Sequence, residues 1–99
     1  MTLPPPRIVV VTIRPPLWRS DLPGLVRRTC AVLASAGEVP IDLVCCDAAG
    51  VEADGVAVDA LAQLALAARG RGCAARLSGA SAELVDLVRF AGLAEVLGR

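Results

Sequence analysis

The chain has 99 residues, which is the size of one domain, and its ten arginines balance ten acidic residues without any Lys or His. A formal net charge of zero argues against nonspecific nucleic-acid binding, which requires a basic surface. The hydrophobic fraction is 56% but the aromatic fraction is 2%, so we expect a core built from Ala, Val and Leu.

The high apolar content does not predict a membrane span. The longest nearly apolar stretch, residues 55–68, contains Asp59 and Gln63 and is shorter than the ~20 residues that a spanning helix needs. The first residues also lack the pattern of a signal peptide. We therefore expect a soluble cytoplasmic protein without direct membrane insertion.

The first predicted elements are a tail and a strand. Residues 1–7 contain three consecutive prolines, which predict a disordered tail before a single domain in residues 8–99. Residues 8–13 (IVVVTI) are rich in β-branched side chains and predict a strand that ends before the next pair of prolines. Trp18, which follows, is expected to act as a lid on the edge of the core.

A first helix is predicted from Asp21, with Ser20 as the competing N-cap, to a stop at Gly37. Apolar side chains recur on one face of this helix, at Leu22, Leu25, Val26, Thr29, Leu33 and Ala36. Arg27 and Arg28 lie off that stripe, and we interpret them as part of a solvated face rather than as an anion contact.

Residues 41–46 (IDLVCC) are almost continuously apolar, which is typical of a strand that is covered on both faces. Cys45 and Cys46 are adjacent on this strand and point to opposite faces, so they cannot easily bond to each other. Because the four cysteines form no CxxC pair and no His is present, we interpret them as buried free thiols. A redox pair between Cys45 and Cys73 is the alternative.

The central segment runs from Asp47 through an acidic turn into a long helix, which begins near Asp54 and ends at Gly70. Plotted at 100° per residue, one face of this helix belongs on the sheet and carries Val58, Leu61, Leu64, Ala65 and Ala68. The opposite face is predicted to point outward and carries Val56, Asp59, Gln63 and Leu66. We expect the protein to function through the turn and this outward face.

The last third of the chain predicts a strand and a helix. Residues 73–77 (CAARL) follow two glycines and form the strand, and Ser81 caps the helix. The buried stripe of that helix is expected at Leu84, Leu87, Val88 and Ala91. Gly92 is placed for a left-handed helix end with Leu93 folding back on Val88, and residues 93–97 are expected to form a short final turn or helix. Strands that alternate with helices predict right-handed crossovers and a mainly parallel sheet.

Three segments and the order of the elements resemble the STAS domain, the fold of bacterial anti-sigma factor antagonists and of cytoplasmic modules of some anion and lipid transporters. The segments are residues 13–25 (IRPPLWRSDLPGL), residues 47–51 (DAAGV, which looks like the family's DLSGV) and residues 69–97 (RGRGCAARLSGASAELVDLVRFAGLAEVL). The resemblance implies an α/β fold in which an about four-stranded, mostly parallel or mixed sheet is packed with three to four helices.

In the STAS family a D-S-S-G signature opens the second helix, and a partner kinase phosphorylates its second Ser. Without gaps through the helix, which we prefer, Asp54 matches the signature Asp, and Gly55 and Val56 replace the two serines. Shifted by one residue, Asp54 replaces the phosphorylated Ser and could mimic its charge, although a plain N-cap is the simpler interpretation. No hydroxyl lies between Ser35 and Ser78, so the resemblance implies a module without the phospho-switch.

The main functional hypothesis is a non-catalytic regulatory protein-interaction module, similar to an anti-sigma factor antagonist in transcription regulation and signal transduction. Its partner would be an anti-sigma or sensor kinase, and its expected partner-binding residues are Asp54, Gly55, Val56, Asp59, Gln63 and Leu66. The alternative is an accessory STAS subunit that docks on the ATPase of an ABC-type lipid transporter. A small ligand at the turn 47–54 ranks last, because the acidic residues there would repel a phosphate.

An enzyme is not expected, because the chain has no His, no Gly-rich phosphate loop and no hydroxyl or thiol paired with a base. No catalytic residue, metal site or cofactor is therefore predicted. The expected partner is a protein and not a nucleic acid, and a homodimer is left open.

Overall fold

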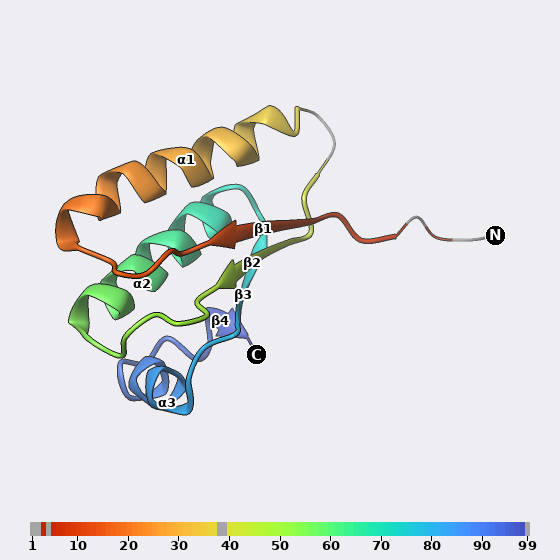
Figure 1. The fold of residues 1–99 in the computed structure, drawn as a ribbon. Coiled ribbons are helices and arrows are strands. Elements are labelled where there is room, and N and C mark those ends of the chain that lie inside the picture. Colours follow the sequence, from red (N-terminus) through yellow and green to blue (C-terminus); the bar gives the residue numbers. More distant parts are fainter. Residues whose placement is uncertain (1–2, 4, 38–39, 99) are drawn as a thin grey trace.

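Helices alternate with parallel strands along the chain (Figure 1). The computed structural model describes residue 3, residues 5–37 and residues 40–98. The elements are β1 (Ile8–Thr12), η1 (Arg19–Asp21), α1 (Leu22–Ser35), β2 (Leu43–Asp47), α2 (Gly55–Gly70), β3 (Ala74–Ser78), α3 (Ala82–Phe90) and β4 (Leu97–Gly98). The strand order is β1-β2-β3-β4 and every pairing is parallel, which confirms the α/β class. The expected fourth strand is represented only by the two residues of β4.

The three α-helices lie on one face of the sheet. The strands follow one another in sequence order, and parallel crossovers are right-handed, so each helix returns to the same side. α2 packs against β2 and β3 and lies between α1 and α3 (Figure 1). Burial alternates along the strands accordingly: Val11 is 9% exposed on the helix side, whereas its neighbour Val10 is 60% exposed.

β2 is not covered on both faces, contrary to the prediction from its apolar run. Val44 and Cys46 are fully buried under the helices, whereas Leu43 and Cys45 are only half-buried on the other side. Ile8 on β1 lies beside Leu43 in the sheet and is 52% exposed. The apolar sequence of β2 could not predict its half-exposed face, because the number of covered faces depends on how the helices and strands are arranged around the strand.

The core consists of small aliphatic side chains, as the composition predicts. The helical residues that pack into it are Leu22, Leu25, Leu33, Ala57, Ala60, Leu61, Leu64, Ala65, Ala68, Leu84 and Val88. Thr29 belongs to the same buried stripe, and its hydroxyl donates to the Leu25 carbonyl at 2.9 Å, so no buried donor is left unpaired there. Val26, Ala36 and Val58, expected on these stripes, are half-buried.

Two helices begin at the caps that the sequence indicates. Asp54 precedes α2, and its Oδ1 accepts a hydrogen bond from the Ala57 N–H at 2.9 Å. Ser81 precedes α3, and its hydroxyl oxygen accepts one from the Leu84 N–H at 3.1 Å. Each contact satisfies a backbone donor that the first helical turn leaves unpaired.

The start of α1 differs from the prediction. Asp21 is the last residue of η1, which runs directly into α1, and its side chain makes no hydrogen bond to the first turn of that helix. Its Oδ2 instead accepts from the Trp18 N–H at 2.9 Å. Ser20, the competing cap, lies inside η1. The Asp21 carboxylate therefore caps the preceding short helix η1, and its hydrogen bond holds the backbone of Trp18.

The end of α3 follows the predicted left-handed pattern. Gly92 has a φ of 80°, and the Leu93 N–H donates to the Val88 carbonyl at 3.1 Å. Ala91 is exposed, so its expected burial is wrong, and Leu87 is half-buried. The segment after Gly92 forms turns and then β4 rather than a further helix.

The cysteines do not share one environment. Cys46 and Cys73 are buried, Cys45 is half-buried, and Cys30 on α1 is exposed, so the interpretation as buried thiols is wrong for Cys30. All four are free. Burial raises the pKa of the Cys46 thiol from 9.0 to about 11, and the charge of the Cys45 thiolate adds to the effect.

The alternative redox pair does not form. In the sheet Cys45 lies beside Arg76 of β3, whereas Cys73 precedes that strand. The two cysteines are therefore offset along the strand direction and are not paired across the sheet. The Cys45 thiol instead contacts the Ser78 hydroxyl at 3.3 Å.

The N-terminal segment is hydrogen-bonded to the rest of the chain at Arg7, directly before β1. Residues 1, 2 and 4 of the expected disordered tail lie outside the described residues. The Arg7 N–H donates to the Asp42 carboxylate at 2.8 Å, and the Arg7 carbonyl accepts from Leu43 at 3.3 Å, so the chain is already fixed to β2 before β1 begins. Among the helices that the structure describes, none combines the length and the hydropathy that crossing a membrane requires.

Candidate functional site

The acidic turn after β2 is held by its own side chain and by β3. Asp47 Oδ1 accepts from the Ala49 N–H at 3.1 Å, and the Ala48 N–H donates to the Ser78 carbonyl at 2.9 Å. Gly79 has a φ of 69°, and a Cβ there would lie 2.9 Å from Asp47 Oδ1. The turn is therefore packed tightly against the carboxyl end of β3, where only glycine fits.

A groove runs between this turn and the segment that links β1 to α1. The two approach each other at Gly50, where a Cβ would lie 3.4 Å from Pro15 Cγ. The groove has a volume of about 440 Å³, and its principal lining residues are Leu17, Trp18, Arg19, Glu52, Asp54 and Val56. We refer to it as the Trp18 groove. Trp18 is 65% exposed, so it does not form the expected lid on the core.

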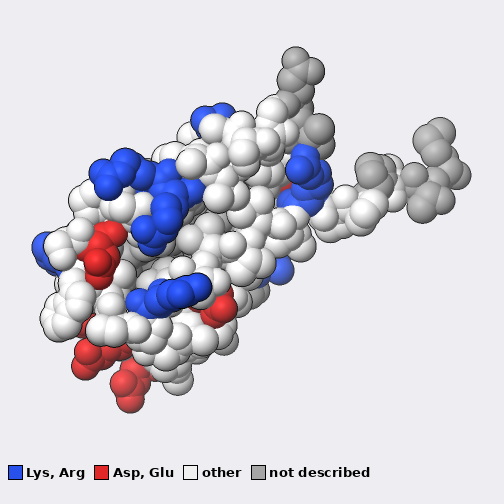
Figure 2. All heavy atoms as spheres, turned by 45° about the horizontal axis from the view of Figure 1, so that its top comes forward, with Lys and Arg blue, Asp and Glu red and all other residues white. Residues whose placement is uncertain are grey.

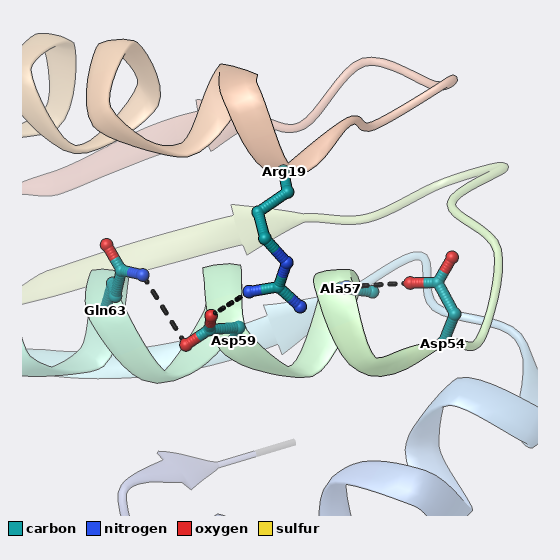
Figure 3. A network of polar contacts seen from close by, with 5 residues as sticks. All are labelled: Arg19, Asp54, Ala57, Asp59 and Gln63. Atoms are coloured by element: carbon teal, nitrogen blue, oxygen red, sulfur yellow. Dashed lines mark hydrogen bonds and ion pairs between the residues drawn. The ribbon is translucent and has the colours of Figure 1, made fainter.

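The outward face of α2 continues from this groove. Leu66 is 66% exposed, which confirms the predicted orientation of the helix, whereas Val56 is half-buried and packs against the core. Asp59 Oδ2 lies 2.7 Å from Arg19 Nη1, and Gln63 Nε2 donates to Asp59 Oδ1 at 3.5 Å (Figure 3). Together with Asp54, which caps α2, three of the predicted site residues thus already make polar contacts within the chain.

The ion pair between Arg19 and Asp59 joins the two sides of the site. Figure 3 shows Arg19 extending from η1 toward α2, so that its guanidinium group lies beside Asp59. The side chains are 64% and 43% exposed, and pairs in such positions stabilise a fold by only about 0–1 kcal/mol. The pair joins η1, which directly follows Trp18, to the outward face of α2.

The structure separates the six predicted site residues into two groups. Asp54 and Val56 line the Trp18 groove, and Gly55 is the exposed first residue of α2 between them. The remaining three, Asp59, Gln63 and Leu66, lie farther along the outward face of the helix.

The sequence analysis did not place Leu17, Trp18 and Arg19 in the site. The available signal was a Leu-Trp-Arg run after two prolines, which belongs to neither the preceding strand nor the following apolar stripe. Nothing in the local sequence indicated that this run would face residues 50–59.

The described lining of the groove combines apolar side chains with three charged ones. Its described lining contains no Ser, Thr, Cys or His, and its charged groups are Arg19, Glu52 and Asp54. In the part of the chain that the structure describes, no three His, Cys, Asp or Glu side chains come together as metal ligands would.

The chain matches no protein-family model, and comparisons with curated proteins and with solved structures give no significant match. The resemblance to the STAS domain therefore depends on the three sequence segments and on the order of the elements.

Proposed function

We propose that this chain is a non-catalytic protein-interaction module, and that its partner docks on the Trp18 groove and the outward face of α2. The observation that carries the proposal is the exposure of two large apolar side chains, Trp18 at 65% and Leu66 at 66%, around the ion pair of Arg19 and Asp59. Leu66 lies two helical turns, or about 10 Å, beyond Asp59 on the same face of α2.

The residue types at this surface support the proposal. Trp and Arg are the residues that most often carry the binding energy of protein interfaces, and here they are consecutive. Glu52 and Asp54 are at the groove and favour a partner segment with basic side chains beside an apolar one. Because Trp18 is held by the Asp21 carboxylate, little ordering of the backbone is needed when a partner binds.

We further propose that the fold is of the STAS type and that the partner is a regulatory protein of the anti-sigma or sensor-kinase class. Support comes from the position of Asp54, which matches the family's signature Asp in one register and lies at the N-cap of α2 next to the groove. Its hydrogen bond to Ala57 favours a capping role over phosphate mimicry. Without a hydroxyl at this point, binding would be constitutive or regulated on the partner.

Affinity purification with matched variants tests the proposal. Leu66→Arg and Asp59→Arg should abolish capture of the partner, while Phe90→Arg, which changes an 89% exposed side chain on α3, should retain it. Leu66→Arg and Phe90→Arg should melt within about 2–4 °C of the wild type, because surface substitutions change stability by about 0.5 kcal/mol or less. Asp59→Arg also removes the ion pair with Arg19, so it should lower the melting temperature by up to about 4–8 °C and still fold.

The identity of the captured protein separates the two regulatory roles. A kinase-fold partner supports the anti-sigma antagonist role, and a transporter ATPase supports the alternative of an accessory subunit. Because the chain contains one Trp, binding of the purified partner should also shift the emission of Trp18 to shorter wavelength. Equal capture by Leu66→Arg and the wild type would show that the outward face of α2 is not the docking surface.

A further inference from the structure

A second hollow lies on the other side of the segment that links β1 to α1. It has a volume of about 710 Å³, within the range of small-ligand sites, and lies between the end of β1 and the first turns of α1. The residues that define it are Arg14, Ser20, Asp21, Gly24, Arg27 and Arg28. Pro15, Pro16 and Leu17 line both this hollow and the Trp18 groove. We refer to it as the arginine cavity.

Two consecutive arginines converge on one point of this cavity. Arg27 and Arg28 lie three and four residues after Gly24, so both are neighbours of this glycine on the surface of α1. A Cβ on Gly24 would lie 3.4 Å from Arg28 Nη1 and 3.9 Å from Arg27 Nη2. Both guanidinium groups therefore reach back one turn along α1 and lie within 4 Å of the position that a Gly24 side chain would take.

This arrangement brings like charges together without an acidic partner. The cavity lining carries three guanidinium groups against one carboxylate, a formal excess of two positive charges. That carboxylate, from Asp21, accepts a hydrogen bond from the Trp18 backbone. Among the residues described by the structure, Arg14, Arg27 and Arg28 form no ion pair with an acidic side chain.

The surface view places this charge on one region of the molecule. Figure 2 shows arginine side chains gathered over the N-terminal part of α1, with an acidic side chain beside them. Arg14, two residues after the end of β1, lines the cavity from the linker that precedes η1. A ligand there would thus contact guanidinium groups from both the linker and the helix.

We propose that the arginine cavity binds a small soluble phosphate-bearing anion, with Arg27 and Arg28 holding the phosphate over Gly24 and Arg14 closing the opposite side. Guanidinium groups match phosphate oxygens in pairs, and an excess of two positive charges corresponds to the ≈ −1.5 to −2 of a phosphate monoester near neutral pH. The Ser20 hydroxyl supplies a further donor at the lining. The volume exceeds that of one phosphate group, so it accommodates an organic substituent as well.

The proposal is tested with inorganic pyrophosphate as the probe. Titration of the full chain at low ionic strength should give saturable amide shifts at Ser20 and Gly24 and a dissociation constant by calorimetry. The double variant Arg27→Gln/Arg28→Gln should weaken binding at least tenfold, and so should Arg14→Gln. The matched control, Arg69→Gln/Arg71→Gln, removes two exposed arginines outside this cavity and should leave the affinity within about twofold.

Three results would overturn the proposal. One is the absence of saturable shifts up to about 10 mM pyrophosphate, since weaker binding has little specificity. Another is an equal loss of affinity in the control variant, which would indicate a general charge effect. The third is binding only to phosphatidic-acid vesicles and not to the soluble anion. Far-UV circular dichroism of each variant establishes that it is folded before its affinity is compared.

Discussion

The buried thiol of Cys46 should make this fold sensitive to alkaline pH. Its pKa is raised from 9.0 to about 11, chiefly by burial and secondly by Cys45, so the folded state keeps a proton that the unfolded chain loses. The contribution to stability is therefore fully present below pH 9.0 and is lost as the pH rises from there to about 11. Between about pH 8 and about pH 10.5 the expected loss is about 2 kcal/mol.

The composition makes this effect unusually easy to isolate. The chain contains neither Tyr nor Lys, so thiols are the side chains that ordinarily titrate in this range. Urea unfolding, followed by circular dichroism at both pH values with a reducing agent present, measures the loss. In Cys46→Ala the pH dependence should largely disappear, whereas Cys30→Ala, which changes an exposed thiol, should keep it.

The reasoning would be refuted if Cys46→Ala lost as much stability as the wild type over the same pH range. If that variant does not fold, alkylation of the wild type gives a second measurement. At about pH 9, iodoacetamide should modify Cys30 and spare Cys46, since the thiolate is the reactive form. Modification of both at similar rates would contradict the assigned burial.

Three further predictions concern single residues, each measured by urea unfolding. Gly79→Ala should destabilise the fold by about 2–3 kcal/mol, because Ala at a φ of 69° is strained and its Cβ would lie 2.9 Å from Asp47 Oδ1; unchanged stability would contradict that packing. Asp54→Ala should cost about 1 kcal/mol by removing the cap of α2, and Asp54→Asn should retain most of it. Gly24→Ala should stabilise α1 by about 0.5–1 kcal/mol while weakening pyrophosphate binding, because the added methyl group would lie beside both guanidinium groups; a gain in both would indicate that the phosphate does not bind over this residue.

The sequence predicted those features whose causes lie within one turn of helix or one strand. The caps at Asp54 and Ser81, the left-handed Gly92 and the outward position of Leu66 all follow from short-range chemistry or from helical periodicity. The start of α1 differs from the prediction because the Asp21 carboxylate can accept either from the first turn of α1 or from the Trp18 N–H. The sequence does not indicate which of these hydrogen bonds forms.

Features that depend on packing between distant segments could not be predicted in this way. Arg19 and Asp59 are 40 residues apart, and their pairing depends on how η1 lies over α2. The open face of β2 depends on the strand order of the whole sheet. The consecutive arginines at 27 and 28 resemble an ordinary solvated face until it is known that Arg14, from the segment after β1, lines the same hollow.

Pro15, Pro16 and Leu17 line both the Trp18 groove and the arginine cavity, so the two hollows share one wall. Whatever displaces that wall from one side alters the shape available on the other. If binding at one hollow displaces this segment, occupancy of the two sites is linked thermodynamically, and the factor by which the anion changes the affinity for a partner equals the factor by which the partner changes the affinity for the anion. A chain without a phosphorylatable hydroxyl between residues 35 and 78 would in this way still respond to a phosphate, through reversible occupancy instead of covalent modification.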